Sequence, residues 1–508
     1  MDTPYNSEWI DLGSVCKDLP TRRLSGDVKI LVTGASGYIG GRLVRELSMR
    51  GYKVRAMVRS HVAHYQRMWP GVEVVIADAL NPQTLGIALN GIHTAFYLIH
   101  SLLLGPRDFT DADNRAAQNF AQTAERCNIR RIIYLGGLGD VGSNLSKHLR
   151  SRIQVADELQ KGTVPVTVLR AAIIIGSGSA SYDIIRHLIT TLPLINIPAS
   201  INTRCQPIAI VDVIKYLVGC LELPATTGRS FDIGGKDILT YQQMLEELSI
   251  LLGKRRLFTN FPFFNVSVYA YVVSLVTPVP EPIIRALFEG LKSEVVCQND
   301  SLREMIPFET LTYRESVERA LLRDAQDKVY TRWSNGYPKD HSLAMMLDAM
   351  GKLPRYILTY SIDTEKSAAV LFESVCKIGG KSGWFQDSWM WWLRGTVDRL
   401  LFGVGSQRGR RSHASLKIND VIDFWRVEDI KQNARLLLRA EMKMPGKGWL
   451  EFTILPQGNG LNKLSVIAYY DTNQLIGRFY WWIFLPLHNI IFTRLIKQIE
   501  QKALKDTL

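Results

Sequence analysis

Three glycines spaced as in a phosphate-binding turn give the sequence its clearest chemical signal. The segment from Gly34 to Gly40 follows the apolar run Val28–Thr33 directly and opens a helical pattern. In such turns the glycines allow a tight bend and let backbone N–H groups approach a pyrophosphate, which the helix N-terminus also favours. An ordinary strand–helix turn is the alternative, but the turn opens the first of several β-α units and therefore predicts a dinucleotide site. Its expected contacts are Gly34, Ser36, Gly37, Tyr38, Ile39 and Gly40.

The end of the second expected strand favours one dinucleotide over the other. NAD sites place a carboxylate there for the ribose 2′-hydroxyl, whereas NADP sites place a basic residue for the 2′-phosphate. This chain has Arg59 and Ser60 and no carboxylate. A guanidinium can hold a phosphate with two hydrogen bonds, and Arg42 and Arg55 could assist. We therefore expect NADP(H), with NAD as the alternative.

A polar residue also ends the third expected strand. Asp78, followed by Ala79, could accept a hydrogen bond from the adenine amino group. An equally good interpretation makes Asp78 a cap for the helix that begins near Pro82.

The elements around these residues alternate between short strands and amphipathic helices, which predicts an α/β fold with a doubly wound parallel sheet. The expected strands are Val28–Thr33, Lys53–Val58, Val72–Ala77, Thr94–Ile99, Arg131–Leu135 and Val166–Ile175. The helices between them are expected near Tyr38–Arg50, Pro82–Leu89, Asp111–Cys127 and His148–Lys161. Looser material follows, including a short strand at Ser230–Ile233, and should cap the sheet and shape a substrate cleft.

The composition shifts beyond a polar stretch, which divides the chain. We expect a tail over residues 1–26, a nucleotide-binding domain over 27–325, a linker over 326–350 and a C-terminal α+β domain over 351–508. The last domain should contain four strands and a long final helix from about Phe479 to Leu504. Eight of the eleven tryptophans lie between Trp384 and Trp482, where they either pack a core or line an apolar pocket.

Composition excludes several classes of protein. The chain has 508 residues, of which 46% are hydrophobic and 21% charged, which is typical of globular proteins. Its net charge of +13 comes mostly from scattered residues, and no nucleic-acid-binding motif appears. The six cysteines have no metal-ligand spacing and suit a reducing cytoplasm. Neither Phe261–Pro280 nor Phe479–Phe492 predicts a transmembrane helix, while contact with a membrane surface stays open for both.

Several stretches resemble a known family. The glycine turn, the pair Asp78-Ala79 and the strand that begins at Arg131 resemble the short-chain dehydrogenase/reductase superfamily, in its atypical, extended and epimerase-like branch with a Rossmann domain. Closer similarity is to a bacterial group that fuses this domain to a C-terminal domain of unknown function. That similarity rests on Tyr97–Ser101, Leu149–Arg152, Leu169–Ala172, Gly176–Ala180, Arg204–Ile208, Asp423–Val427, Gly446–Phe452 and Tyr480–Trp482. The C-terminal pattern also resembles helix-grip (START-like) domains.

The resemblance implies a catalytic Tyr-x-x-x-Lys pair that this chain lacks. By spacing, His148 and Arg152 stand where the tyrosine and lysine would be, and a histidine can serve as a general acid or base. His100 and Ser101, after the fourth strand, are a second candidate pair near the nicotinamide. The alternative interpretation is equally good: the catalytic pair is lost, and these residues only begin a helix or contact the cofactor.

Two functions of different classes follow. The first is an NADP(H)-dependent oxidoreductase that acts on a small or moderately apolar substrate. The second is a non-catalytic NADP(H)-binding protein that senses redox state or assists assembly, with a lipid or a partner on its C-terminal domain. An epimerase or dehydratase with tightly held NAD is disfavoured by Arg59. The sequence indicates neither the substrate nor the oligomeric state.

Overall fold

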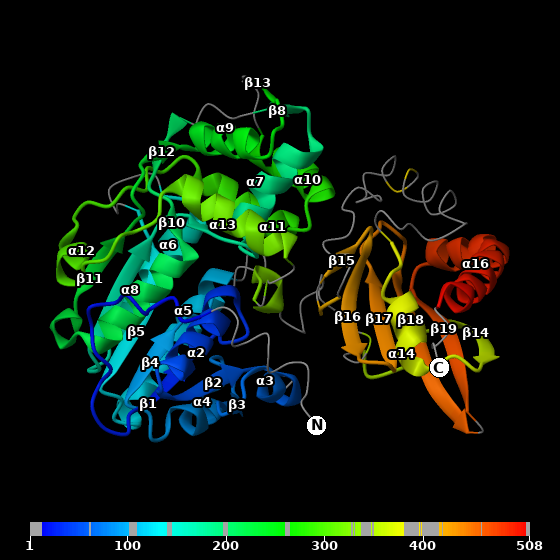
Figure 1. The fold of residues 1–508 in the computed structure, drawn as a ribbon, viewed down its shortest axis with the longest axis horizontal. Coiled ribbons are helices and arrows are strands. Elements are labelled where there is room, and N and C mark those ends of the chain that lie inside the picture. Colours follow the sequence, from blue (N-terminus) through cyan, green and yellow to red (C-terminus); the bar gives the residue numbers. More distant parts are fainter. Residues whose placement is uncertain are drawn as a thin grey trace. The chain divides into compact units, whose positions relative to one another are not determined.

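The computed structural model describes most of the chain. The described residues are 13–59, 62–100, 109–139, 145–196, 202–259, 265–326, 329, 331–336, 347, 350–379, 396, 398, 416–418, 420–458 and 460–503. Contacts divide the chain into two compact units: Met1–Val273 with Val279–Tyr337, and Ser274–Pro278 with Pro338–Leu508. Each unit has a sheet and a core of its own (Figure 1).

A seven-stranded parallel sheet forms the centre of the first unit and confirms the predicted α/β fold. The strand order is β11-β6-β5-β4-β1-β2-β3. Its strands are β1 (Lys29–Val32), β2 (Lys53–Val58), β3 (Glu73–Ile76), β4 (Thr94–Tyr97), β5 (Arg131–Gly137), β6 (Val166–Ala171) and β11 (Ser230–Ile233). The order reverses between β1 and β4, and ligands of such sheets bind at that point, beyond the carboxyl ends of the strands.

Helices cover both faces of this sheet because its strands are apolar on both sides. Ile30 and Val32 of β1 belong to the core on one face, and Leu31 to the core on the other. The covering helices are α2 (Tyr38–Met49) and α8 (Ile210–Glu222) on the first face, and α4 (Pro82–Leu89), α5 (Phe109–Arg126) and α6 (Lys147–Gln160) on the second. The sheet is therefore doubly wound, as predicted.

A helical cap with a third core lies beyond the carboxyl ends of the strands. Its helices are α7 (Ala180–Thr191), α9 (Tyr241–Leu251), α10 (Val266–Val276), α11 (Glu281–Gly290) and α13 (Tyr313–Ala325). Short strand pairs tie it together: β7 (Ile174–Ile175) with β10 (Ile208–Ala209), β8 (Leu194–Asn196) with β13 (Leu257–Thr259), and β9 (Arg204–Cys205) with β12 (Leu239–Thr240). The expected cap strand Ser230–Ile233 belongs to the main sheet instead, where it pairs with β6. The unit also contains α3 (Val62–Met68), α12 (Ser301–Met305) and the 3-10 turns η3 (Pro224–Thr226) and η4 (Trp333–Gly336).

Residues 13–26, expected as part of a tail, pack against the first unit. Cys16 is fully buried in the core beside α2 and α8. Glu46 of α2 accepts hydrogen bonds from the backbone N–H groups of Val15 and Cys16 at 3.1 Å each. The apolar residues of this segment were too few to stand out in the sequence, although they complete the core.

The second unit is α+β, as predicted, with a six-stranded antiparallel sheet in the order β14-β19-β18-β17-β16-β15. The strands are β14 (Tyr356–Thr364), β15 (Val421–Ile422), β16 (Trp425–Lys431), β17 (Arg435–Ala440), β18 (Lys447–Gly458) and β19 (Leu461–Asp471). The helices are α14 (Ala368–Val375) and α16 (Leu475–Lys502). Sequence analysis missed β14, and the helix-grip interpretation stays a prediction.

The described tryptophans of this unit favour the packing interpretation. Trp425, Trp449 and Trp481 are buried, and the Trp449 indole donates a hydrogen bond to Glu428 at 2.9 Å. Trp482 is the exception, with 63% of its surface exposed. Trp384, Trp389, Trp391 and Trp392 lie outside the described residues. Within the described part of the chain, no helix has the length and hydropathy needed to cross a bilayer.

Candidate functional site

The glycine turn joins β1 to α2 with the geometry that a pyrophosphate requires. Gly34 has a φ of +59°, and a Cβ there would lie 2.5 Å from the Leu98 carbonyl oxygen. A Cβ on Gly40 would lie 2.2 Å from the Gly34 carbonyl oxygen. Gly37 precedes α2 and supplies no side-chain cap, so the first N–H groups of the helix face no competing side chain from that position. The turn therefore fits the phosphates of a dinucleotide.

A cluster of polar side chains lies beside this turn, at the end of β2. Ser36 and Arg59 both lie close enough to the Tyr65 phenol to influence its pKa. Burial raises the pKa of Tyr65, while Ser36 and Arg59 partly oppose this rise. The structure thus brings together a guanidinium and two hydroxyls where the 2′-phosphate is expected. Tyr65 was missed in the sequence, and Ser60 lies outside the described residues.

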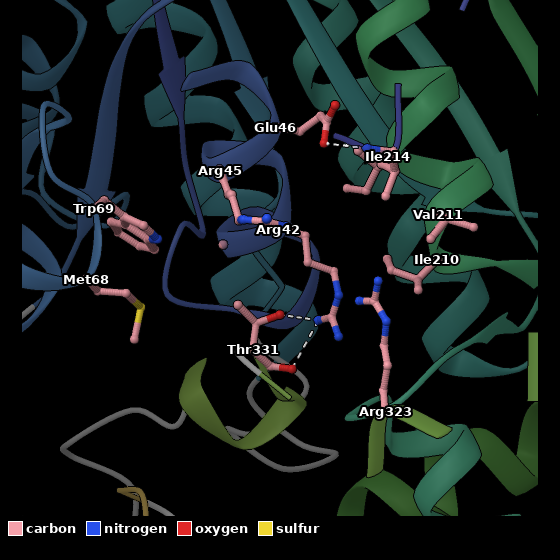
Figure 2. Close-up of a pocket in the computed structure, with 12 residues that line it drawn as sticks. Arg42, Arg45, Glu46, Met68, Trp69, Ile210, Val211, Ile214, Arg323 and Thr331 are labelled. Atoms are coloured by element: carbon pink, nitrogen blue, oxygen red, sulfur yellow. Dashed lines mark hydrogen bonds between the residues drawn. The ribbon is translucent and has the colours of Figure 1, made fainter. Parts of the chain in front are cut away.

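Two arginines expected to assist there are occupied elsewhere. The Arg42 guanidinium donates to the carbonyl oxygens of Thr331 at 3.0 Å and Ser177 at 2.8 Å, and Figure 2 shows its bonds to Thr331 in a small separate hollow. Arg55 pairs with Glu73 at 2.9 Å and donates to the carbonyl oxygen of Ala88 at 2.8 Å. The expectation that they assist phosphate binding is wrong, because their donors hold loops and sheet edges.

Asp78 stabilises its own turn. Its Oδ1 accepts a hydrogen bond from the Leu80 N–H at 2.9 Å, while Asn81 caps α4 by accepting from the Gln83 N–H at 3.1 Å. The expectation that Asp78 caps this helix is therefore wrong, because Asn81 is the cap and Asp78 holds the turn before it. The contact of Asp78 with adenine stays a prediction. Ala79 is buried, and its carbonyl accepts from Asn119 at 3.0 Å.

Both candidate histidines lie together beyond β4 and β5. The rings of His100 and His148 are 4.9 Å apart between centroids. His100 Nδ1 lies 3.0 Å from the Asp113 carboxylate, which is almost fully buried on α5. Ser151 also donates to Asp113 at 3.5 Å. The two candidate pairs from the sequence are thus one cluster, although Ser101 lies outside the described residues.

Two buried imidazole nitrogens remain available in this cluster. His100 Nε2 and His148 Nδ1 have no hydrogen-bond partner in the described part of the chain. An unpaired buried nitrogen is costly unless a ligand completes it. The pair therefore offers hydrogen-bonding groups to a bound molecule.

Arg152 stands beside the histidines and is held in place. It donates to the Leu135 carbonyl oxygen and lies over the Tyr134 ring, 5.2 Å from the centroid. Tyr134 in turn donates to the Arg152 carbonyl oxygen at 3.0 Å. A fixed positive charge at this point can attract an anionic or partly negative group without acting as a proton donor.

Burial and positive charge favour the neutral form of both histidines. Burial is the main cause that lowers the pKa of His100, and Asp113 partly opposes it. The pKa of His148 lies well below its ordinary value because of burial, with further contributions from His100 and Arg152. Of the two, His100 is the one beside a carboxylate that stabilises its charged form.

A cavity of about 400 Å³ joins the histidine cluster to the helical cap. Its lining includes His100, His148 and Arg152, and also Tyr38 and Ile39 of the glycine turn. The remaining wall is almost wholly apolar, with aliphatic and aromatic residues from α7, α9, α10 and α11 such as Ile184, Leu188, Met244, Leu245, Ile283 and Phe288. Such a cavity suits a largely apolar ligand with one polar group at the histidine end.

Asp113 was missed in the sequence, although it carried a signal. It lies four residues before Ala117 and seven before Phe120, both fully buried, and therefore on the apolar face of α5. A carboxylate on such a face needs a partner. The partner is thirteen residues earlier in the chain, and only folding shows which group it is.

Comparison with family models identifies both parts of the chain. Residues 34–186 match a family described as NAD(P)H-binding, and residues 354–495 match a family described as a protein of unknown function (DUF2867). The first part is thus an NAD(P)H-binding domain. Among the described residues, no group of three or more His, Cys, Asp or Glu side chains is arranged to hold a metal ion.

Curated relatives include enzymes and an assembly factor. The chain is 23% identical over 256 residues to the photosystem II assembly factor Ycf39 of Trieres chinensis, covering 48% of this chain and 76% of the relative. It is 26% identical over 261 residues to the chloroplastic divinyl chlorophyllide a 8-vinyl-reductase of Zea mays, covering 48% and 64%. Sterol demethylase protein B of Methylococcus capsulatus is 36% identical over 121 residues, which are 22% of this chain and 36% of that protein.

Solved structures similar to this chain include two reductases. The triphenylmethane reductase of Citrobacter sp., complexed with NADP(H), gives a TM-score of 0.48 at 19% identity and covers 57% of this chain and 99% of its own. The NADPH-dependent quinone oxidoreductase of Escherichia coli, complexed with NADPH, gives 0.46 at 18% identity with the same coverage.

Proposed function

The chain joins an NAD(P)H-binding, epimerase-like domain of the short-chain dehydrogenase/reductase type to a C-terminal domain of unknown function, and we propose that it is an oxidoreductase. Its cofactor would be NADP(H), and its substrate would be apolar. One observation carries this proposal: His100, which is hydrogen-bonded to Asp113, lines a cavity whose wall is mostly apolar. The cavity begins beside the glycine turn, so that the cofactor and a substrate would meet at the histidines.

In this mechanism His100 replaces the missing tyrosine as the proton donor. Bound NADPH supplies a hydride to the substrate. Asp113 holds His100 through Nδ1, which leaves Nε2 for the substrate's polar group. His100 in its charged form donates a proton from Nε2 to the atom that gains negative charge, and Asp113 stabilises that charged form. The apolar wall excludes water, which strengthens these interactions.

Label transfer tests this mechanism directly. NADPH deuterated at C4, on either face, is incubated in a cell extract with and without the purified protein, and products are searched for deuterium by mass spectrometry. We expect protein-dependent label in an apolar product. His100→Gln should lower the rate by about 100-fold while NADPH still binds, and Asp113→Asn should lower it by roughly 10-fold through loss of orientation. His93→Gln, at the opposite end of β4, is the matched control and should leave the rate unchanged.

The same assay has a pH signature. Because burial lowers the pKa of His100, acidification should increase the fraction of its charged form. Reduction should therefore accelerate as pH falls from 7.5 toward the pKa by nearly tenfold per unit at most, while oxidation by NADP⁺, which needs neutral His100, should slow near that pKa. A reduction rate that is insensitive to His100→Gln and pH would place the proton donor elsewhere.

A second candidate is a non-catalytic NADP(H) sensor or assembly protein. The observation that favours it is His148 at the position of the expected tyrosine, together with a relative that is named an assembly factor and is covered over 76% of its length. Absence of label transfer on either face, in a sample where NADPH binding is verified, would support this candidate and refute the oxidoreductase.

A further inference from the structure

The first sixteen residues of α16 present an apolar face to solvent. The residues of this face, named here the α16 face, are Leu475, Ile476, Phe479, Trp482, Ile483 and Ile490, with exposed fractions of 70%, 73%, 70%, 63%, 68% and 46%. Their spacing places them along one side of a helix over sixteen residues, which is about 24 Å at 1.5 Å per residue. Large contiguous apolar surfaces of this kind mark places where another surface binds.

Packing on the opposite side fixes the orientation of this helix. Gly477 lies so close to the β17–β18 connection that a Cβ there would be 2.3 Å from the Pro445 carbonyl oxygen. Trp481 is buried and stacks on Tyr470 and Tyr356, with centroid distances of 5.5 and 5.2 Å. Rotation that would bury the α16 face would expel these residues. The face is therefore a permanent feature of the folded unit.

The second half of the same helix is packed in the ordinary way. Phe492, Leu495, Ile496 and Ile499 belong to the core of the second unit, with α14 and the sheet. In Figure 1 α16 lies beside β19 and β14, at one edge of that sheet. Core packing therefore accounts for the second half of the helix but leaves the α16 face uncovered.

Charge indicates what kind of partner suits the α16 face. From Leu475 to Ile499 the helix contains no Asp or Glu, whereas Arg478, Arg494 and Lys497 are all exposed. Arg478 lies next to Phe479 at one end of the face, and the other two lie beyond Ile490 at its other end. The whole chain has a net charge of +13. Apolar side chains flanked by cations complement a surface with a hydrocarbon interior and anionic groups above it.

We propose that the α16 face docks the second unit on the surface of an anionic lipid bilayer. The helix lies in the plane of the membrane, where Phe479, Trp482 and Ile483 enter the boundary between headgroups and acyl chains. Tryptophan is suited to this depth because its ring is apolar and its N–H reaches water. Arg478, Arg494 and Lys497 contact phosphates. This inference is independent of the proposed reaction and concerns the other unit of the chain.

Vesicle flotation with the full chain tests the proposal. We compare vesicles of phosphatidylcholine alone with vesicles that contain about 30% phosphatidylglycerol, at about 0.1 M and about 1 M NaCl. We expect binding to the anionic vesicles, weakened by salt. The triple variant Phe479→Ser, Trp482→Ser, Ile483→Ser should lower the bound fraction at least roughly 10-fold, and Arg478→Glu should lower binding to anionic vesicles alone.

The matched control substitutes three equally exposed apolar residues of the first unit: Ile87→Ser, Ile250→Ser and Leu322→Ser. It should bind vesicles like the unaltered chain. Circular dichroism and NADPH binding verify that both triple variants fold. The proposal is overturned by absence of vesicle binding, or by equal losses in both triple variants. It is also overturned if only the α16 variant abolishes self-association in the absence of lipid, since a second copy would then cover the face.

Discussion

At the scale of residues, Arg59 is the residue on which the predicted preference for NADP(H) depends. The sequence placed a guanidinium at the end of β2, and the structure adds Ser36 and Tyr65 beside it. By contrast, Arg42 and Arg55 have the same side chain but hold backbone carbonyls. Residue type alone therefore does not identify a phosphate ligand, and its neighbours in three dimensions do.

Arg59→Ala should weaken NADPH binding by roughly 10- to 100-fold, the equivalent of about 1.5–3 kcal/mol for a hydrogen bond to a charged group. NADH binding should change little, because NADH has no 2′-phosphate. Titration of both cofactors by fluorescence measures the two affinities. Arg130→Ala, at the opposite edge of the sheet, is the control. Equal losses for both cofactors would remove the basis for the NADP preference.

At the scale of elements, the β1–α2 turn shows how local sequence fixes a binding site. Its glycines are required because neighbouring backbone atoms leave no space for a Cβ, as the 2.2 Å approach at Gly40 shows. The strand before it and the helix after it are both apolar on their buried sides, so the turn is anchored at both ends.

Gly40→Ala should destabilise the first unit by about 1–3 kcal/mol, as is typical when a side chain is forced into a filled space. It should also weaken NADPH binding, because α2 must move away from the turn. Gly86→Ala provides the control. It lies in α4 with open space around the added methyl, and should stabilise the protein by about 0.5–1 kcal/mol. Thermal unfolding and NADPH titration of both variants measure these effects, and unchanged binding by Gly40→Ala would place the phosphates elsewhere.

At the scale of the whole molecule, the two units have separate cores and separate sheets. The cofactor turn, the histidine cluster and the apolar cavity all belong to the first unit. The α16 face belongs to the second. This division separates the proposed chemistry from the proposed membrane contact.

Calorimetry should therefore show two unfolding transitions, and NADPH should raise the Tm of only one of them. A ligand present at 100 times its Kd stabilises the unit that binds it by about 2.7 kcal/mol. The other transition should keep its Tm, and in Gly40→Ala the shift of the first should be smaller at the same NADPH concentration. A single transition that moves as a whole would mean that the two units unfold together.

The sequence by itself determined the elements of the first unit and its glycine turn. Both depend on local properties: the period of apolar residues distinguishes strand from helix, and a turn is built from adjacent residues. The alternation of these elements also predicted a parallel sheet, because parallel strands need crossover helices, but the strand order and the place of Ser230–Ile233 at its edge came from the structure. Family resemblance added the NAD(P)H-binding domain, which the family match confirms.

Only the tertiary structure decided the contacts between distant segments. Asp113 and His148 meet at His100 because α5 and α6 pack side by side, and no local pattern reports that. The alternation of half-buried and exposed residues along β14 is a local strand signal that sequence analysis overlooked, whereas its pairing with β19, which places Tyr356 opposite Tyr470, is visible only in the structure. Periodicity indicates which side of a helix or strand is buried. Which neighbouring element covers that side depends on the free energy of burial, which is shared among many residues and is gained only when the whole core assembles.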